Sequence, residues 1–554
     1  MSKGLTGFRL QLIWDRLIAV VEEQAQTLIR TAFSASTREA GDLSAGVFDP
    51  DGRMLAQAVT GTPGHINTMA AAVGHFLRAI PPGEMHDGDV YVTNAPWMGS
   101  GHLNDFTVVT PVHYAGEVVA LFAATVHVID IGGQNTGVAA RDVYEEGFYM
   151  PIMPLARAGV LDQTLLGLLR ANVREPIQVE GDLYSLMACN RAGAKRLAAL
   201  LDEFGAPALR AAGAHILEAS RAAMLRAIAD CPHGTWRATM EIDGVDTPIL
   251  LAVTLSIEAG GITVDYAGTS PASAYGINVP KTYSDAYTSY AVRCVIGPEV
   301  PNNAGSLSTI KVLAPPGCIV NALRPAPVCS RHMIGQLLPD ATFGALRQVF
   351  PARVPAESSS TLWNLRLSAI TGAAEPFTVT TFNAGGMGAR PGLDGLSATS
   401  FPPGVRNVPI EITEAIAPLV FWKKALRTGT GGHGRHRGGD GQVIEVGHRH
   451  GEAFSINPTF ERVVWPARGA DGGGNGATGR IRLASGAVLT PKGRQTIPAG
   501  DRLVAEMPGG GGIGAPRERD HAALARDIEY GYVGAAEARD IYHWASDIQP
   551  EEHT

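Results

Sequence analysis

The fold of the N-terminal part is decided by three consecutive segments, Phe106-Thr-Val-Val-Thr-Pro-Val-His113, Tyr114-Ala-Gly-Glu117 and Val118-Val-Ala-Leu-Phe-Ala-Ala-Thr-Val-His127. Two runs rich in strand-forming residues flank a short segment in which Gly116 can adopt a positive φ, and this pattern is typical of a β-hairpin. Closing the hairpin places Asp105 opposite Val126 or His127, depending on the register. The two open ends of the hairpin therefore bring polar residues close together.

On either side of this hairpin, hydrophobic spacing predicts further elements. Apolar residues recur at helical intervals through residues 9–33, and a Pro-Asp-Gly turn joins two short strands within residues 45–57. Residues 190–230 are rich in Ala, Leu, Glu and Arg, which favours a helix. We therefore expect residues 1–232 to form an α+β unit that carries the candidate site described below.

The rest of the chain is richer in strands and glycine. Alternating apolar residues from 235 to 266 predict an antiparallel sheet, and helices are expected at 283–296 and 341–350. These elements define a central β-rich unit at residues 233–360. From 361 to 554, glycine runs interrupt strand-like sequence and helices close the chain. The expected fold class is therefore mixed α+β with three units.

Composition narrows the class of protein. The net charge of −8 is spread over 554 residues, and the basic clusters are not interleaved with aromatics as on a nucleic-acid surface. Residues 1–15 lack a continuous apolar segment, and the longest apolar run, 118–126, is too short to span a bilayer. Five scattered cysteines without a C-x-x-C pair argue against disulfides and a thiolate zinc site. We expect a cytoplasmic protein that binds neither nucleic acid nor membrane.

Candidate metal ligands gather at the open ends of the predicted hairpin. His102 and Asp105 lie at the start of its first strand, His127 ends its second strand, and Asp130 follows three residues later. Imidazole and carboxylate together suit Mn²⁺, Fe²⁺ or Zn²⁺. Glycines flank both groups, which permits a ligand to approach closely. The alternative is that these side chains cap turns and form ordinary hydrogen bonds.

Other polar residues could add to this site. A fourth ligand could come from Glu39 or Asp42, although the polar run that contains them could equally be an ordinary turn. His65, in Gly64-His-Ile-Asn, could move protons or could be a turn residue. A separate set of histidines lies among arginines and glycines, and we expect it in a solvated loop rather than at a metal: His433, His436, His448 and His450.

The chain carries no recognisable nucleotide-binding motif. The glycine run Pro508–Gly514 could cradle a phosphate through backbone N–H groups, but it lacks the Lys-Ser/Thr ending of a P-loop. A nucleophile elbow and a Ser-His-Asp order are also not recognisable. We therefore predict that this run is structural or covers a substrate, and that ATP would have to be bound by another subunit.

Several of these stretches, taken in order along the chain, resemble the hydantoinase B/oxoprolinase family. The resemblance rests on Ser36-Thr-Arg-Glu-Ala-Gly-Asp-Leu-Ser-Ala-Gly-Val-Phe-Asp-Pro-Asp-Gly-Arg53, Gly88-Asp-Val-Tyr-Val-Thr-Asn94, Gly101-His-Leu-Asn-Asp105, His127-Val-Ile-Asp-Ile-Gly-Gly133, Glu145-Glu-Gly147, Pro301-Asn-Asn-Ala-Gly305, Arg437-Gly-Gly-Asp-Gly441, Pro508-Gly-Gly-Gly-Gly-Ile-Gly514 and Asp527-Ile-Glu-Tyr-Gly-Tyr-Val533. These blocks cover essentially the whole chain, and an ordered series is more specific than any one motif. One departure is Ala95, which stands where the family usually has Asp.

The resemblance implies the B-type subunit of a two-component, ATP-dependent enzyme. Its metal shell would consist of Asp42, His102, Asp105 and His127. Asp130 would be a further ligand or would contact one, and His65 or His127 would move protons. An A-type partner in a hetero-oligomer would bind ATP and Mg and would phosphorylate an oxygen of the substrate.

Three functions are compatible with this resemblance. In a hydrolase, water activated by a divalent metal would attack a phosphorylated lactam or cyclic imide. In a ketone carboxylase of the acetone or acetophenone type, the same metal would stabilise an enolate while CO₂ adds to carbon. The third possibility is a non-catalytic scaffold subunit, which Ala95 makes more credible. The hydrolase is the preferred hypothesis.

Overall fold

The computed structural model describes residues 7–373 and 375–544, so the expectation for residues 1–15 lies partly outside the described range. The chain divides into two compact units. Unit 1 consists of Met1–Thr239, Leu251–Ala345 and Gly404–Val408, and unit 2 consists of Met240–Leu250, Leu346–Pro403 and Pro409–Thr554. Both contain helices and strands, which confirms the mixed α+β class. The finer division at residues 232 and 360 stays a prediction.

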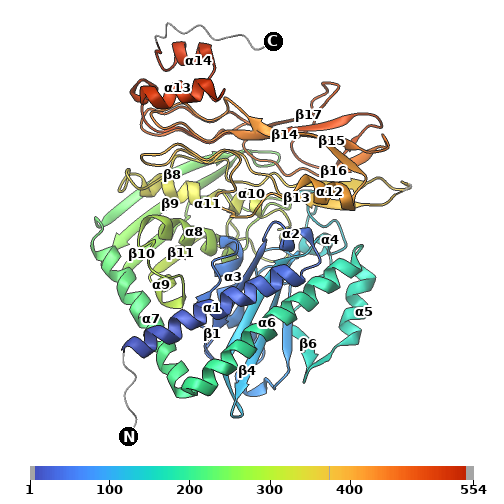
Figure 1. Ribbon diagram of the computed structural model, residues 1–554, viewed down its shortest axis with the longest axis vertical. Helices are drawn as coiled ribbons and strands as arrows, with labels where there is room; N and C mark the ends of the chain where they lie inside the picture. The colour runs from blue at the N-terminus through green and yellow to red at the C-terminus, as the bar shows by residue number, and fades with distance from the viewer. Residues whose placement is uncertain (1–6, 374, 545–554) are drawn as a thin grey trace. The chain divides into compact units, whose positions relative to one another are not determined.

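Unit 1 is built around a seven-stranded antiparallel sheet with the order β2-β1-β5-β4-β3-β6-β7 (Figure 1). Its strands are β1 (Leu43–Phe48), β2 (Met54–Gln57), β3 (Val90–Thr93), β4 (Asp105–Tyr114), β5 (Glu117–His127), β6 (Met153–Arg157) and β7 (Val160–Leu161). The central pair β4–β5 is the predicted hairpin. Its register pairs Asp105 with His127, which settles the two alternatives left open by the sequence.

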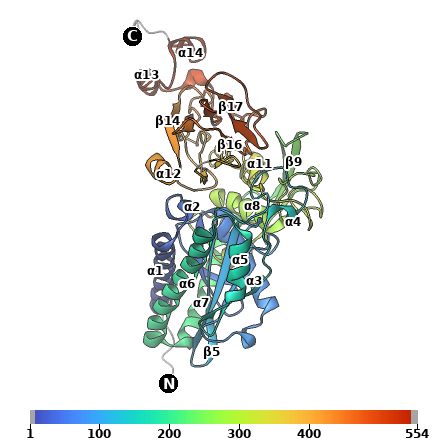
Figure 2. The same ribbon diagram turned by 90° about the vertical axis from the view of Figure 1, so that its right-hand side faces the viewer.

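Helices cover both faces of this sheet (Figure 2). The helices of unit 1 are α1 (Gly7–Thr31), α2 (Ala35–Arg38), α3 (Pro63–Ala79), α4 (Val143–Glu146), α5 (Gln163–Asn172), α6 (Pro176–Phe204), α7 (Ala206–Ala229), α8 (Lys281–Val295), α9 (Ala304–Leu307), α10 (His332–Gly335) and α11 (Leu338–Leu346), with a 3-10 turn at Pro82–Glu84. Side chains alternate across β5: Phe122 packs with α1 and α6, whereas Leu121 and Ala123 pack with α3. The sheet is therefore buried on both faces, which explains the long apolar run.

The single helical stretch predicted for residues 190–230 is two helices. The chain breaks between α6 and α7 at Gly205, which has a φ of +78°. Pro207 follows in the first turn of α7, where its missing N–H costs nothing. The two helices can therefore take different directions, and both contribute to the core against the sheet.

A second, four-stranded sheet follows, with the order β11-β10-β9-β8. Its strands are β8 (Gly234–Ile242), β9 (Ile249–Glu258), β10 (Gly261–Asp265) and β11 (Ile310–Leu313). The β9–β10 pair is antiparallel, as predicted, but β11 returns through α8 and α9 and pairs parallel with β10. Helix α8, at the predicted position, packs on α3 and carries Tyr283 toward the site described below.

Unit 2 is a strand-rich unit with two four-stranded sheets, ordered β13-β12-β16-β18 and β14-β15-β19-β17. Its elements are β12 (Leu365–Ala369), β13 (Thr378–Thr381), α12 (Ile410–Ile416), β14 (Leu419–Arg427), β15 (Gly441–His448), β16 (Phe454–Ile456), β17 (Arg480–Leu483), β18 (Gln495–Ile497), β19 (Arg502–Glu506), a 3-10 turn at Pro516–Glu518, α13 (His521–Glu529) and α14 (Ala535–Asp540). Apolar residues of both sheets share one core, in which the rings of Trp363 and Phe460 stack at 4.1 Å.

The glycine runs of unit 2 are ordered and lie side by side as extended segments. Hydrogen bonds link their backbones directly, as from Gly510 N–H to the Gly439 oxygen (2.9 Å) and from Gly432 N–H to the Gly510 oxygen (2.8 Å). A Cβ at Gly510 would lie 2.2 Å from the Met387 oxygen, far inside van der Waals contact. These hydrogen-bonded glycine runs of unit 2 are called the glycine bundle below. The segment Pro508–Gly514 lies buried within it. Close backbone approach is thus the structural reason for these glycines.

Among residues 7–373 and 375–544, no helix combines the length and apolar character required to cross a membrane.

Candidate metal centre

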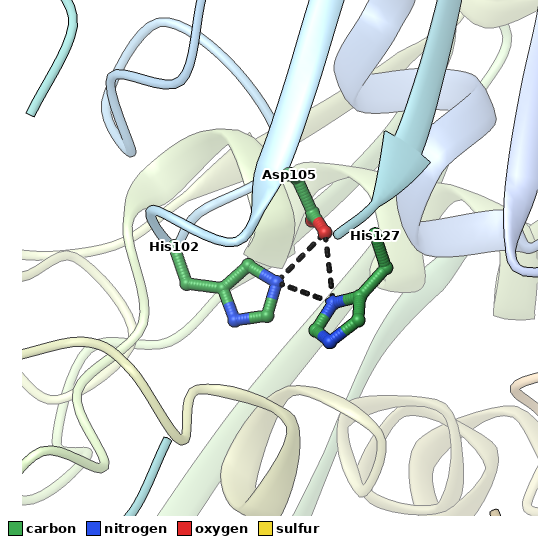
Figure 3. Close-up of side chains that lie close together, drawn as sticks. All are labelled: His102, Asp105 and His127. Atoms are coloured by element: carbon green, nitrogen blue, oxygen red, sulfur yellow. Dashed lines mark hydrogen bonds and ion pairs between the residues drawn. The ribbon is translucent and has the colours of Figure 1, made fainter. Parts of the chain in front are cut away.

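Three of the predicted ligands come together at the open end of the β4–β5 hairpin (Figure 3). The Nε2 atom of His102 lies 2.8 Å from Oδ1 of Asp105 and 3.2 Å from Nδ1 of His127. The His127 Nδ1 atom is also 3.2 Å from Oδ1 of Asp105. His102 and Asp105 are buried, and His127 is partly buried. The hairpin register positions two of the three, and the turn before β4 positions the third.

The imidazole of His102 is neutral and oriented. Its Nδ1 atom lies 3.1 Å from the backbone oxygen of Cys329, which can only accept, so the proton resides on Nδ1. Burial and the nearby Arg331 guanidinium lower the pKa of His102 to about 3. The Nε2 lone pair is therefore directed at Asp105 and His127.

The carboxylate of Asp105 has two different sides. Oδ1 faces His102 and His127, whereas Oδ2 lies 3.1 Å from Nε2 of His65 and 2.6 Å from Nη2 of Arg331. Burial opposes ionisation, but the cationic Arg331 guanidinium and other side chains around the carboxylate hold the pKa of Asp105 well below its usual value. Asp105 is therefore ionised, and its outer oxygen is already occupied.

His65 links the cluster to Asp42. It lies in the first turn of α3, where the Thr62 side chain caps the helix, and it is buried. Its Nδ1 atom is 3.4 Å from Oδ1 of Asp42. Burial lowers the pKa of His65, but Asp105 and Asp42 outweigh this effect, so the net shift is upward. Asp42 thus approaches the cluster through His65 and lies outside the group of three donors.

Asp130 also lies outside the group of three donors. Its Oδ1 atom accepts hydrogen bonds from Arg174 (2.7 Å) and from the Asn135 amide (3.0 Å). The Asn135 oxygen in turn accepts from Asn104 (2.7 Å), the residue before Asp105. Of the two roles predicted for Asp130, this arrangement favours contact with the cluster through other residues.

Several residues near the cluster carried no recognisable signal in the sequence. Arg331 is buried, donates to the Ser100 oxygen, and stacks over the ring of Tyr283 at 4.0 Å. His332 is buried beside it, and burial together with Arg331 lowers the pKa of His332 to about 3. The only local hint is a short polar run, Cys329-Ser-Arg-His332, between apolar residues.

Two other sequence expectations concern residues that are not among the three donors. Ala95 is fully buried and its backbone N–H bonds the Thr93 hydroxyl, so no carboxylate is contributed at this position. The histidines at 433 and 436 are half-buried within the glycine bundle rather than in a solvated loop, and His433 contacts Glu537 at 2.7 Å. His448 ends β15 and His450 is exposed in the turn that follows, and the described residues form no metal-like group from these four histidines.

The three donors fit a divalent first-row cation. With Nδ1 of His102 protonated, its Nε2 lone pair faces the ionised Asp105 oxygen at 2.8 Å, which is repulsive unless a cation lies between them. Ligands about 2.1 Å from a metal are about 3.0 Å apart at right angles and about 3.4 Å apart in a tetrahedron. The observed distances of 2.8–3.2 Å between the donor atoms match ligands at right angles around a metal. The Cys329 oxygen on the other nitrogen of His102 is the outer contact typical of a metal-binding histidine.

The fold places the chain in the class of large α+β proteins that includes an ATP-dependent caprolactamase from Pseudomonas jessenii. That structure superimposes with a TM-score of 0.90 at 26% identity, covering 98% of this chain and 97% of the other. An acetone carboxylase shares the fold, with a TM-score of 0.86 at 20% identity, over 97% of this chain and 79% of the other.

Within this class, the chain belongs to the hydantoinase B/oxoprolinase family, whose profile matches residues 7–516. It is 30% identical to an uncharacterized protein of Methanocaldococcus jannaschii, over 92% of this chain and 91% of that protein. The putative B subunit of a D-/L-hydantoinase from a Pseudomonas species is 27% identical over 96% and 94% of the two chains. The 5-oxoprolinase 1 of Arabidopsis thaliana is 28% identical over 92% of this chain but only 42% of its own length. The family resemblance seen in the sequence is confirmed.

Proposed function

We propose that this chain is the metal-bearing, B-type subunit of an ATP-dependent hydrolase that acts on a cyclic amide after its oxygen has been phosphorylated. The observation that carries the proposal is the set of two imidazoles and one carboxylate, whose donor atoms lie 2.8–3.2 Å from one another in a largely buried site. Similarity to a caprolactamase and to the B subunit of a hydantoinase favours a lactam or cyclic imide as the substrate.

The residues of the cluster suggest how the chain would contribute to hydrolysis. His102, Asp105 and His127 would hold Mn²⁺, Fe²⁺ or Zn²⁺, and such a cation would polarise a bound oxygen and acidify water. Arg331 and His65 hold the outer oxygen of Asp105, so that one oxygen faces the site. His65 lies between two carboxylates and is our candidate for holding a proton during the reaction.

ATP and Mg would be bound by a separate, A-type subunit. The chain aligns with 94% of the hydantoinase B subunit but only 42% of the 5-oxoprolinase 1, so the second protein has a large additional part. We infer that this additional part corresponds to the partner of the present chain. A hetero-oligomer would then bring the phosphorylated substrate to the cluster.

Two other functions remain alternatives. Acetone carboxylase shares the fold, and carbon–carbon bond formation would also use a cation next to an oxyanion. A scaffold subunit without catalysis would need no metal. The hydrolase is preferred because the relatives covered over nearly their full length include a hydantoinase B subunit and a caprolactamase.

Elemental analysis of the full chain, alone and with its A-type partner, tests the proposal. We expect near-stoichiometric Mn, Fe or Zn in the wild type and its loss in His102→Ala and His127→Ala. His113→Ala is the matched control, because His113 lies on the same hairpin at the far end of β4. Metal-free wild-type protein in both preparations would overturn the proposal and favour a scaffold.

Activity measurements then separate the two reactions. With the partner, ATP and metal present, a hydrolase releases phosphate together with ring-opened product from a lactam or hydantoin. A carboxylase instead consumes bicarbonate only when a ketone is supplied. Ring opening that depends on His102 supports the hydrolase, whereas bicarbonate consumption without ring opening identifies the carboxylase.

A further inference from the structure

Glu146, the last residue of α4, is a fully buried carboxyl group outside the metal cluster. Its Oε1 atom accepts hydrogen bonds from the backbone N–H groups of Val328 and Cys329, the latter at 2.8 Å. The other oxygen, Oε2, accepts none in the described part of the chain. Burial raises the pKa of Glu146 to about 7, against the effect of the two N–H groups. Burying a carboxyl group is costly, so its position calls for an explanation.

The segment that Glu146 binds touches the cluster twice. The backbone oxygen of Cys329 accepts from Nδ1 of His102, which fixes the tautomer and ring orientation of that residue. Two residues later, Arg331 binds Oδ2 of Asp105 at 2.6 Å. The segment 328–331 therefore orients two of the three donors, and the Glu146 carboxyl group anchors its first half.

The backbone of Glu146 holds the other side of the cluster. Its carbonyl oxygen accepts from the N–H of Asn135 (2.8 Å). The Asn135 side chain accepts from Asn104 and donates to Asp130. Asn104 precedes Asp105 and also donates to the Val128 oxygen, next to His127. This close fit requires Gly133, because a Cβ there would lie 2.7 Å from the Glu146 backbone.

We propose that Glu146 is a positioning residue for the metal centre, acting through its hydrogen bonds to the 328–329 backbone rather than through its charge. The proposal rests on the proposed function, because it presumes that His102, Asp105 and His127 bind a cation. Glu146 lies 182 and 183 residues from the groups that it binds, so it ties the loop after the hairpin to a distant segment. Without this tie, the Cys329 oxygen would no longer hold the His102 ring.

Two substitutions separate hydrogen bonding from charge. Glu146→Gln loses the charge but keeps an oxygen whose two lone pairs can accept both N–H groups. Glu146→Asp keeps the charge but shortens the side chain, so that it cannot reach both donors. Glu145→Asp is the matched control, because Glu145 is the exposed neighbour on the same helix. Both changes at position 146 are small, and thermal unfolding identifies the folded fraction of each variant.

The experiment is titration of metal-free full chain with Co²⁺, followed by the visible absorption of the bound ion. We expect Glu146→Asp to bind about 10-fold or more weakly than the wild type, with an altered spectrum, as for other outer contacts of metal ligands. Glu146→Gln and Glu145→Asp should match the wild type in affinity and spectrum.

Wild-type affinity in folded Glu146→Asp would overturn the positioning role. Weak binding by Glu146→Gln together with normal binding by Glu146→Asp would also overturn it, because the charge of Glu146 would then be what matters. Absence of Co²⁺ binding in the wild type would overturn the proposed function and this inference together.

Discussion

The His–Asp cluster of unit 1 and the glycine bundle of unit 2 show two opposite ways of fixing a chain in place. In the cluster, side chains from distant segments are held by charge and hydrogen bonds, as when Arg331 and His65 bind the same oxygen of Asp105. In the bundle, backbone groups bond each other directly, as between Gly510 and Gly439, and side chains are absent from the contact. The cluster depends on the functional groups of its side chains, whereas the bundle depends on the absence of side chains.

This difference predicts different responses to mutation. A side chain in the cluster can change size at moderate cost, provided that a hydrogen-bonding group remains for its buried partner. In the bundle even a methyl group has no space, because the nearest atoms are backbone atoms that belong to hydrogen-bonded neighbours. The comparison can be tested by adding atoms in one region and removing charges in the other.

The largest effect is expected from Gly510→Ala. The new methyl carbon would lie 2.2 Å from the Met387 oxygen and 2.3 Å from its carbonyl carbon, so the backbones must separate and lose hydrogen bonds. We expect unit 2 to lose more than about 3 kcal/mol of stability. Gly534→Ala is the control in the same unit, because a Cβ there meets no atom within 4 Å, and its effect should be within about 0.5 kcal/mol. Chemical denaturation measures both, and equal stability of the two variants would refute close packing as the role of these glycines.

An effect of comparable size is expected from Asp105→Asn in metal-free protein. The substitution leaves the buried Arg331 guanidinium without its carboxylate, and breaking a buried ion pair in this way costs about 3–5 kcal/mol. Asp51→Asn is the control, because the Asp51–Arg53 pair of the same unit is exposed and should contribute less than about 1 kcal/mol. Unfolding of unit 1 in denaturant measures the difference. A stability close to the wild type for Asp105→Asn would mean that the cluster is not organised by charge.

Unit 2 also contains a buried ionisable group, and the stability of this unit should therefore depend on pH. Burial and the nearby Asp243 raise the pKa of Glu461 to about 7, although Lys492, at 3.0 Å, opposes the shift. Because the folded state holds this proton more tightly than the unfolded state, the resulting stability is present below about pH 4.5 and is lost as the pH rises through about 7. Glu461→Gln does not titrate, so its stability should fall less than that of the wild type over this range. Denaturation at several pH values measures the slopes, and parallel profiles would contradict the upward shift.

The parts of the structure that the sequence predicted are the local ones. The hairpin, its register alternatives and the meeting of His102, Asp105 and His127 follow from a turn and two strands within about 30 residues. The long helix at the N-terminus and α8 follow from hydrophobic spacing. In these cases the residues that determine the geometry are close together in the sequence.

The parts that the sequence did not predict depend on distant contacts. Arg331 lies 226 residues from Asp105, and no local pattern marks it as a partner of that carboxylate. The break at Gly205 was missed because the surrounding composition favours helix throughout. The glycine runs are visible in the sequence, but which runs bond each other depends on packing within unit 2 that spacing alone does not specify.

The smallest effect, expected from Asp130→Asn, decides the remaining question about the cluster. If Asp130 were a ligand, its loss would abolish metal binding as His102→Ala should. The structure instead connects it to Asp105 through Asn135 and Asn104, and Asn at position 130 would keep an oxygen for the Asn135 amide while weakening the bond to Arg174. We therefore expect Co²⁺ affinity to fall only about 10-fold, in the range found for outer contacts of metal ligands.

Arg174→Gln should produce a similar loss, because it removes the same contact from the other side. Complete loss of binding in Asp130→Asn with normal binding in Arg174→Gln would instead identify Asp130 as a ligand. It would then follow that Asp130 lies closer to the three donors when a cation is bound than its hydrogen bonds in this structure indicate.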